Sequence, residues 1–249
     1  MDLLHVATLN ILSLFDRWAE RLPLILADMS ALQPDILGLQ EVVYEMQQDR
    51  IIGAAGEGHY AVLRAWAARP EFGNSLLVKA PLDYGAPERI DLDHARSALV
   101  ATVDLPGGGS VRTVVTHFHA IIGATDVRDR QAAVLLEGLG NDPSRDVPTI
   151  LMGDFNADPT EPAYGRIVGA GFRSAYAEAN GTEPEVTWPS GLEGPAIDTD
   201  GEPRCLDYIW VRGPIRVVYA RLVFDRPHPD DPGLFPSDHV GIAAHLEIG

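Results

Sequence analysis

The sequence predicts one domain of mixed α/β or α+β structure over residues 1–249. Short apolar segments typical of β-strands recur from Leu3 to Leu246, and segments with helical periodicity lie between them. No internal repeat, low-complexity tract or obvious linker divides the chain. A length of 249 residues fits one large domain or two small ones. The interleaving of strands and helices along the whole chain favours one domain.

The first part of the chain alternates strands with helices. Two of its segments place apolar residues three or four positions apart, which is typical of helices. The predicted order is a strand at Leu3–Leu9, a helix at Asp16–Met29, a strand at Asp35–Leu39 that ends at Gln40-Glu41, and a helix at Tyr44–Ile52. Gly53 stands near the end of the second helix, where helices commonly stop.

The middle of the chain is richer in strands. The predicted strands are Tyr60–Trp66, Asn74–Val78, Ser97–Leu105 and Val111–Phe118. Leu105-Pro-Gly-Gly-Gly-Ser110 is a strong turn signal between the last two. We therefore expect these two strands to form a hairpin.

The last part begins with helices and ends with strands. Predicted helices cover Val127–Leu139 and Thr160–Val168, with Thr160 placed to cap the second and Pro162 tolerated in its first turn. Between them, Thr149–Met152 is a β-rich segment that runs into Gly153-Asp154. After a Gly- and Pro-rich region at Gly181–Pro203, strands are predicted at Leu206–Val211, Ile215–Phe224 and Val240–Leu246.

The charge of the chain argues against long nucleic acid as a partner. There are 36 acidic residues against 19 basic ones, a formal net charge of −17, and Lys79 is the one lysine. A protein that grips a polyanion needs Lys and Arg on its contact surface to displace counterions. Long duplex DNA or RNA is therefore a poor first choice of substrate. The alternative interpretation is that an acidic surface simply keeps the protein soluble.

The compartment is predicted from the N-terminus and from the cysteine content. Met1-Asp-Leu-Leu-His5 lacks the positive start and long apolar stretch of a secretory signal. No apolar run approaches the roughly 18 residues that would span a bilayer. The single cysteine, Cys205, excludes an internal disulfide and suits a reducing compartment. We expect a cytoplasmic protein without a transmembrane segment, although a secreted form with its signal removed would look the same.

Six polar motifs stand at the ends of apolar segments. Strand ends hold side chains on a rigid frame and open onto a cleft, which suits a functional site. Taken singly, each residue is as readily explained as a turn or cap residue. The motifs are Thr8-Leu9-Asn10, Leu39-Gln40-Glu41, Val115-Thr-His117-Phe-His119, Met152-Gly-Asp154-Phe-Asn156, Cys205-Leu-Asp207-Tyr-Ile209 and Pro236-Ser-Asp238-His239.

The ordered set of motifs resembles the endonuclease/exonuclease/phosphatase (DNase I-like) superfamily. Gly153-Asp154-Phe155-Asn156 is followed by Asp207-Tyr208 and then by Ser237-Asp238-His239, in the expected order and with the expected spread. The resemblance covers the chain from the strand of Asn10 to the C-terminal motif. It implies an α+β four-layer αββα sandwich, in which two mixed β-sheets pack face to face, helices cover them, and the site lies at one end.

The resemblance also implies a role for each motif. Glu41 matches the principal metal ligand, with Asn10 and Asp238 as further ligands, direct or through water. Oxygen ligands of this kind suit Mg²⁺ or Mn²⁺. Asp154 matches the residue that orients or deprotonates the attacking water, and Asn156 would hold a phosphoryl oxygen or that same water.

The histidines complete this implied site. His239, paired with Asp207, resembles the His–Asp dyad of the family, and His117 matches the histidine that donates to a phosphoryl oxygen. The chemistry needs these residue types, because hydrolysis adds charge to phosphoryl oxygens and requires a group that handles the proton of the water. Either Asp154 or His239 is the general base. We favour Asp154 for orienting the water and His239 for stabilising the phosphoryl group.

Three further residues are candidates for substrate binding. Asn74 matches a position near the substrate in relatives and is equally well explained as a turn residue. Arg96 either approaches the phosphate or is a surface charge. Trp188, in Thr187-Trp188-Pro189, either stacks on a ring of the substrate or fills the core. Arg130 and Gln131, on the helix after His117, are expected to play a supporting structural role.

The expected function is metal-dependent hydrolysis of a small, soluble phosphodiester or phosphomonoester. The chain lacks a basic insertion for gripping duplex DNA, an apolar hairpin for membranes, and the disulfide pairs of secreted nucleases. One alternative is a nuclease acting on short or single-stranded ends, which requires Arg64, Arg69, Arg96 and Arg130 to gather around the cleft. The others are a sphingomyelinase-like phospholipid phosphodiesterase and a catalytically inactive relative that binds a metal or a partner. The sequence leaves the oligomeric state, the number of metals, and the choice between mono- and diester open.

Overall fold

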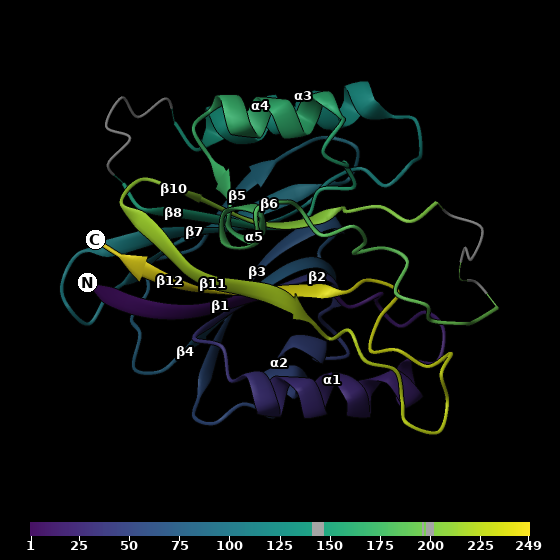
Figure 1. The fold of residues 1–249 in the computed structure, drawn as a ribbon. Helices are drawn as coiled ribbons and strands as arrows, with labels where there is room; N and C mark the ends of the chain where they lie inside the picture. Colours follow the sequence, from purple (N-terminus) through teal and green to yellow (C-terminus); the bar gives the residue numbers. More distant parts are fainter. Residues whose placement is uncertain (141–146, 196, 198–201) are drawn as a thin grey trace.

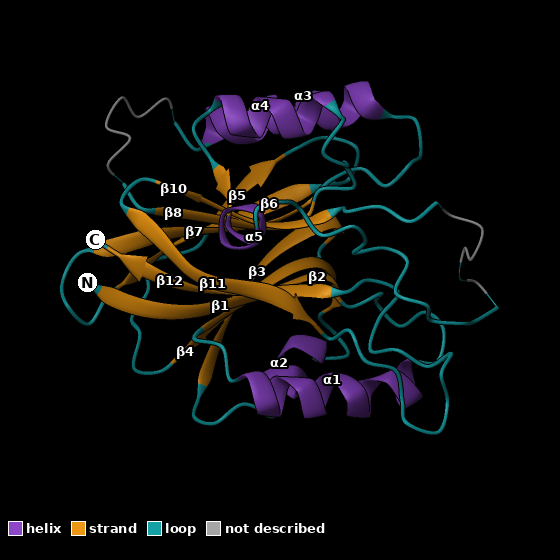
Figure 2. Ribbon diagram, viewed as in Figure 1, coloured by secondary structure: helices purple, strands orange, loops and turns teal. Residues whose placement is uncertain are grey.

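Two β-sheets lie face to face between two layers of helices. The computed structural model describes residues 1–140, 147–195, 197 and 202–249. Helices α3 (Thr125–Gly138) and α4 (Pro162–Gly169) cover one sheet, and α1 (Trp18–Leu32) and α2 (Gln48–Gly53) cover the other (Figures 1 and 2). The predicted αββα sandwich is therefore confirmed.

The first sheet, here called sheet A, contains both ends of the chain. Its strand order among the described residues is β11-β12-β1-β2-β4-β3. β1 is antiparallel to β12 and parallel to β2, so it lies inside the sheet with a partner on each side. The bounds are β1 Asp2–Asn10, β2 Ile36–Val43, β3 Tyr60–Arg69, β4 Phe72–Lys79, β11 Ile215–Val223 and β12 Gly241–Ile248.

The second sheet, sheet B, is built from the middle of the chain. Its strand order among the described residues is β5-β6-β7-β8-β10-β9, with β7 and β8 parallel and the other pairs antiparallel. The predicted hairpin is confirmed as β6 and β7. The bounds are β5 Glu88–Asp91, β6 Ser97–Asp104, β7 Ser110–His117, β8 Thr149–Asp154, β9 Arg173–Ser174 and β10 Asp207–Arg212.

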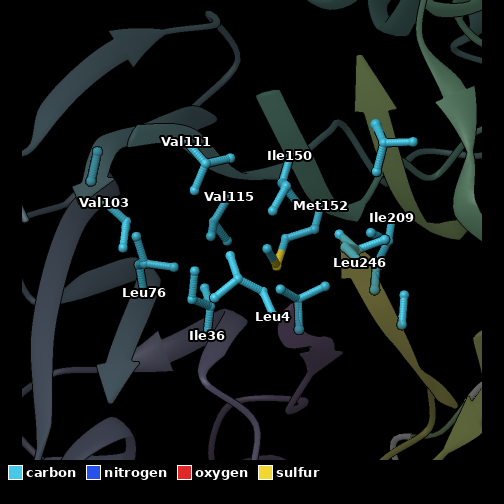
Figure 3. Close-up of a cluster of buried hydrophobic side chains, with 14 of the residues drawn as sticks. Leu4, Ile36, Leu76, Val103, Val111, Val115, Ile150, Met152, Ile209 and Leu246 are labelled. Atoms are coloured by element: carbon cyan, nitrogen blue, oxygen red, sulfur yellow. The ribbon is translucent and has the colours of Figure 1, made fainter. Parts of the chain in front are cut away.

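The main core lies between the two sheets. Alternate residues of the strands point into it, among them Leu4 and Ile36 of sheet A and Val115 and Met152 of sheet B (Figure 3). Each is almost fully buried, and burying such apolar side chains contributes about 1.5–3 kcal/mol apiece. The close approach of the sheets is visible at Gly38, where an added Cβ would lie 2.8 Å from Met152 Sδ.

Two further apolar clusters fix the helices to the outer faces of the sheets. Ile25 and Met29 of α1 pack on sheet A together with Leu9 and Leu37. On sheet B, α3 and α4 pack over a group of aromatic rings that includes Phe155 and Trp210. A short helix, α5 (Ala175–Asn180), begins at Ser174, whose side chain accepts a hydrogen bond from the amide of Ala177. None of the helices in the described residues is long and apolar enough to cross a membrane.

Several predicted boundaries differ from the structure. The helix predicted at Tyr44–Ile52 is shorter, because its first residues form a turn and α2 begins at Gln48. The capping role predicted for Thr160 is wrong: α4 begins at Pro162 after Glu161, and Thr160 instead bonds to the carboxylate of Asp158. Pro162 does occupy the start of the helix, as predicted. Strands β5 and β9 and helix α5 were not predicted.

Candidate active site

Three catalytic candidates lie on neighbouring strands of sheet B. His117 ends β7, Asp154 ends β8 and Asp207 begins β10. Because β7 and β8 are parallel and β10 is antiparallel to β8, the register pairs His117 with Asp154 and Asp154 with Asp207. The three side chains therefore meet at one edge of sheet B, although they are far apart in the sequence.

Sheet A brings Asn10 and Glu41 to the same end of the sandwich. Asn10 is the last residue of β1, and β1 runs parallel to β2. The strand of Glu41 was predicted to end at that residue, but β2 continues to Val43. Its pairing with β4 shifts register between Leu39 and Val42, and Glu41 has a φ of 60°. Such bulges re-aim a side chain, and the left-handed backbone of Glu41 costs free energy that a functional position can justify.

The motif at residues 236–239 reaches the site from the loop before β12. The Ser237 hydroxyl donates to the main-chain oxygen of Asn10 over 2.6 Å, which joins this loop to the end of β1. Asp238 and His239 follow directly. The strand motifs of the two sheets, which carry Asn10, Glu41, His117, Asp154 and Asp207, thus lie together with the C-terminal motif.

Asp154 is the centre of the cluster. Its Oδ2 accepts from Asn10 Nδ2 at 3.0 Å, and lies 3.4 Å from His117 Nε2 and 3.6 Å from His239 Nε2. Its Oδ1 accepts from the amide of Asn156 at 2.8 Å. Burial and the nearby charge of Asp207 raise the pKa of Asp154 to about 7, although His239 and the bonds from Asn10 and Asn156 partly oppose this shift. A carboxyl group with this pKa exchanges protons readily at neutral pH.

His239 forms a buried pair with Asp207. Its Nδ1 lies 2.9 Å from Asp207 Oδ2. Burial alone lowers the pKa of His239, but the charges of Asp207, Asp154 and Asp238 outweigh burial and raise the pKa well above its usual value. His239 is therefore an imidazolium at neutral pH, with Nε2 directed toward Asp154.

His117 has the opposite character. Burial lowers its pKa well below the usual value, and the positive charges of Arg96 and His239 lower it further. His117 is therefore neutral at pH 7. Its Nε2 has no hydrogen-bond partner of adequate geometry among the described residues. A buried nitrogen of this kind is costly unless a ligand meets it.

A cavity of about 250 Å³ opens above this cluster. Trp188 forms part of its wall and donates from Nε1 to Asp238 Oδ2 over 3.2 Å. The backbone of Trp188 pairs with that of Arg204 in an isolated antiparallel bridge, so the two side chains stand next to each other. The cavity is lined by Glu41, His117, Ala120, Ile122, Arg128, Asp154, Asn156, Trp188, Glu202, Arg204, Leu206, Asp238 and His239.

Asn74 and Arg96 lie beside the cavity rather than in its wall. Both line a narrow recess that also touches Glu41 and His117. Asn74 Nδ2 donates to the oxygen of Ser97 over 2.8 Å, which ties β4 to β6, and Arg96 Nε donates to the oxygen of Phe118 over 2.9 Å. Arg96 is thus a largely buried cation near the metal-binding candidates and not a surface charge.

The other arginines considered for a nuclease groove are used elsewhere. Arg64 pairs with the buried Asp49, and Arg130 forms an exposed pair with Asp126 one turn away. Arg69 lies 3.7 Å from Glu71 on the surface. None of the three lines the cavity. Gln131 is buried and accepts from the amide of His119 at 2.9 Å, so its predicted structural role agrees with its position.

Sequence reasoning did not single out several residues of the cavity wall. Arg128 is buried, pairs with Glu161 at 2.7 Å, and donates to the oxygens of His119 and Ile121. It thereby holds the loop that presents Ile122 to the cavity. Arg204 stands three residues before Asp207 in the sequence, and that nearness to a motif is the one signal that pointed to it.

Two sets of side chains have the chemistry to hold a cation. Glu41, Asp238 and Asn10 offer oxygen ligands. Burial together with the charge of Asp238 raises the pKa of Glu41, while His239, the bond from Asn10 and Arg96 oppose this shift, so a divalent cation here would relieve the repulsion between the two carboxylates. Asp154, Asp207 and His239 place one ligand atom each within 4.8 Å of one another. The first set fits a hard divalent ion better, because an imidazolium such as His239 cannot act as a ligand.

The geometry of Asn10 defines its part in such a site. Its Oδ1 accepts from the amide of Leu12 at 3.0 Å, and Nδ2 faces the carboxylates of Asp154 and Glu41 at 3.0 and 3.4 Å. In this arrangement Asn10 would act on a metal through water, which is one of the two modes predicted for it, and it would also hold Glu41 in place.

Comparison with known families agrees with this site. The model of the endonuclease/exonuclease/phosphatase family matches residues 7–239. The chain therefore belongs to this family, a class of metal-dependent phosphoesterases and nucleases, and the resemblance seen in the sequence is confirmed.

Individual relatives share between 20% and 28% of their residues with this chain. Nocturnin of Xenopus laevis is 28% identical over 259 residues, which cover 93% of this chain and 65% of that protein, so the chain spans less than two thirds of its relative. The catalytic domain of human nocturnin with bound sulfate superposes with a TM-score of 0.78 and 25% identity, covering 100% of this chain and 97% of that one. A family member from Bacteroides vulgatus has the same fold, with a TM-score of 0.80 and 20% identity over the full length of both chains.

Proposed function

We propose that this protein is a divalent-metal-dependent hydrolase that adds water to the phosphorus of a small, soluble phosphodiester or phosphomonoester. One observation carries the proposal. A carboxyl group with a pKa of about 7, an imidazolium and a neutral imidazole meet in one cavity. Asp154, His239 and His117 supply them within 3.6 Å of one carboxylate oxygen. These are the groups that proton transfer and phosphoryl stabilisation require.

The metal side of the site would be Glu41 and Asp238, with Asn10 behind them. Bound there, Mg²⁺ or Mn²⁺ would neutralise charge on a phosphoryl oxygen and favour attack by water. The chain's own residues fix the carboxylates: Asn10 donates to Glu41 over 3.4 Å, and Trp188 donates to Asp238 over 3.2 Å.

The two histidines act on the phosphoryl oxygens in different ways. His239, held cationic by Asp207, offers a charge-assisted bond from Nε2 to an oxygen whose negative charge grows during the reaction. His117 is neutral, and its unpartnered Nε2 is free to donate a second bond. The catalytic domain of human nocturnin has a bound sulfate, a tetrahedral anion of the same shape as phosphate, which supports a phosphate ester as the class of substrate.

Asp154 is the residue that orients the attacking water and takes its proton. Its Oδ1 is fixed by the amide of Asn156, and burial holds its pKa near that of a base that works at neutral pH. The side chain of Asn156 donates one bond to the oxygen of Phe118 over 3.2 Å and keeps a second N–H for a phosphoryl oxygen or the water.

A small substrate is favoured by the size and walls of the cavity. Its volume of about 250 Å³ is below the roughly 300–1,000 Å³ typical of pockets for drug-sized ligands. The apolar part of the wall is formed by Trp188, Leu206 and Ile122. Arg204 also lines the cavity, and its guanidinium lies 3.9 Å from the carboxylate of the exposed Glu202. The net charge of −17 opposes the approach of a long polyanion.

The proposal is tested with bis-p-nitrophenyl phosphate and p-nitrophenyl phosphate. Release of nitrophenol is followed with Mg²⁺, with Mn²⁺ and with chelator, for the wild type, Asp154→Asn and His239→Ala. We expect metal-dependent release that both substitutions reduce by about 10²-fold or more, since each removes a group that acts in the transition state. The preferred ester separates a phosphomonoesterase from a phosphodiesterase.

Matched controls are His59→Ala and Asp230→Asn, which change exposed residues of the same types away from the cavity. They should keep wild-type rates. Release that survives chelator, or that the two site substitutions leave unchanged, would contradict the proposal. Metal binding measured by calorimetry without turnover of either ester would favour a catalytically inactive relative.

A further inference from the structure

Arg21 is a buried arginine in the first turn of α1. Its side chain has 0% exposure. A positive charge near a helix N-terminus opposes the helix dipole, and a buried charge is costly unless hydrogen bonds compensate it. The local sequence of α1 therefore gives no reason for a cation at this position.

The guanidinium is fully used in hydrogen bonds to the main chain. An arginine side chain has five N–H donors, and Arg21 makes five bonds, all to backbone carbonyl oxygens. The acceptors are Asp16 at 2.7 Å, Ile11 at 2.9 Å, Pro236 at 3.0 Å, Leu12 at 3.4 Å and Phe15 at 2.7 Å.

These acceptors belong to two segments that carry site residues. Residues 11–16 follow Asn10, and Pro236 precedes Ser237-Asp238-His239. One nitrogen, Nη1, bonds to both Ile11 and Pro236 and so links the two segments. The hydroxyl of Ser237, which donates to the oxygen of Asn10, is a second link between them.

The segment at residues 11–16 needs such support. Leu12, Ser13 and Asp16 have φ values of 55°, 47° and 24°, a region that side chains other than glycine rarely adopt. The amide of Leu12 also donates to Asn10 Oδ1, and this bond turns Nδ2 of Asn10 toward Glu41 and Asp154. By holding this segment in place, the bonds from Arg21 therefore help to fix the orientation of the Asn10 side chain.

Arg21 also carries its charge at neutral pH. Burial lowers its pKa to about 10, and the negative charges of Asp238, Asp16 and Glu41 oppose that decrease. The guanidinium therefore stands as a fixed cation behind the two carboxylates of the candidate metal site.

We propose that Arg21 is a positioning residue of the active site, which holds the strand end of Asn10 against the loop of Asp238 at the spacing that a divalent cation needs. The inference rests on the proposed function in one respect, namely that Glu41, Asp238 and Asn10 form the metal side of the site. Arg21 does not touch the cavity and acts through the main chain.

The test compares Arg21→Lys and Arg21→Met with Arg112→Met. Arg112 lies near the start of β7, at the opposite end of this strand from His117, and donates to the main-chain oxygen of Leu139. It is the control for loss of an arginine that bonds to the main chain away from the site. Dissociation constants for Mg²⁺ and Mn²⁺ are measured by calorimetry, and urea unfolding identifies the folded variants. We expect both Arg21 variants to bind metal about tenfold more weakly, the usual scale for outer residues that orient ligands, and Arg112→Met to bind like the wild type.

Charge and positioning predict opposite results for Arg21→Met. Loss of a nearby positive charge alone would tighten metal binding, while Arg21→Lys, which keeps the charge, would leave it unchanged. That pattern, or unchanged affinity in both variants, would overturn the proposal. An equal loss in Arg112→Met would assign the effect to general stability and would overturn it as well.

Two further measurements cover other outcomes. If neither Arg21 variant folds, Ser237→Ala removes the second link. Weaker metal binding by this variant supports the proposal, and unchanged binding overturns it.

If the wild type binds neither metal, the proposed function fails and amide hydrogen exchange decides the inference. Arg21→Lys should then speed exchange at Leu12 and in residues 237–239 but not in β6 or β7, and uniform or unchanged exchange would overturn the inference.

Discussion

The bond between His239 and Asp207 reverses what burial alone would do to an imidazole. A buried histidine normally loses its proton, as His117 does. The carboxylate of Asp207, 2.9 Å from Nδ1, keeps His239 charged and fixes which nitrogen faces the cavity. Two histidines of one site thus have different charges because one has a buried carboxylate partner.

Asp207→Asn should therefore reduce catalysis more than it reduces stability. The amide keeps nearly the same shape but carries no charge, so the pKa of His239 would fall and its cationic form would be less favoured. We expect the specificity constant for a p-nitrophenyl ester to fall about 10²-fold, the scale seen when one electrostatic donor is removed. Steady-state rates at saturating Mg²⁺ measure this, with Asp230→Asn as the control. A decrease smaller than twofold would exclude the dyad from the mechanism.

At this scale the sequence predicted the charged residues better than their surroundings. Asn10, His117, Asp154 and the C-terminal motif could be singled out because they end apolar segments and occur in a recognisable order. Arg21 could not, because its acceptors are backbone oxygens, which leave no trace in the side-chain sequence. The bulge that turns Glu41 inward depends on pairing with β4, a contact between distant segments.

At the scale of elements, β1 and β12 carry a second pair of histidines on the side of sheet A that faces the helices. The rings of His5 and His245 stack with centroids 4.2 Å apart. Burial, with the charges of His245, Arg221 and Lys79, lowers the pKa of His5 to about 4 from 6.5. The native state therefore disfavours protonation of His5, whereas the unfolded chain accepts a proton near its usual pKa.

This difference predicts how stability depends on pH. Between about pH 6.5 and pH 4 the unfolded state binds more protons at His5, so stability falls as the pH falls through this range and is fully present above it. His5→Gln should remove this part of the loss. Because His5 is partly exposed, we expect an effect of about 1 kcal/mol, or roughly 2–4 °C in Tm near pH 5.

Thermal unfolding of the wild type and His5→Gln from pH 7.5 to 4.5 measures the effect. The two curves should lie parallel above pH 6.5 and converge or cross below it, with the wild type losing more. Curves that remain parallel across the whole range would show that His5 contributes nothing to the acid sensitivity of sheet A.

The elements that the sequence missed are the shortest ones. β9 has 2 residues and β5 has 4, too few to display a period, and both exist because a neighbouring strand offers them an edge. Long segments such as Val111–Phe118 were predicted nearly to their ends, since seven or eight residues are enough to show alternation or an apolar run.

At the scale of the whole molecule, a crowded contact at Gly38 limits how closely the two sheets can approach each other. Gly38 of β2 lies against Met152 of β8 and Val115 of β7, and an added Cβ would come within 2.8–3.0 Å of them. The two sheets carry the two halves of the site, so a change in their separation would change the distance between Asn10 and Asp154.

Gly38→Ala should therefore destabilise the protein by about 1–3 kcal/mol through overpacking. Met152→Val in the same chain should recover part of the loss, because it removes the nearest atom, and the two effects should not add. Gly165→Ala on α4 is the control, since nothing lies within 4 Å of its Cβ position. Urea midpoints compare the variants; a Gly38→Ala protein as stable as the wild type would mean that the sheets adjust freely.

The pairing of β1 with β12 also has a consequence for how activity arises during folding. The register joins Asp2 to Ile248, and β1 reaches its other partner, β2, through only one helix. Closing so long a loop is entropically unfavourable and slow compared with pairing neighbours. Asn10 meets Ser237 and Asp238 only once that closure is made. A chain shortened before residue 236 would lack β12, which joins β1 to β11, and the whole C-terminal motif. Turnover would therefore report that the two ends of the chain have paired, and not only that the middle of the chain has folded.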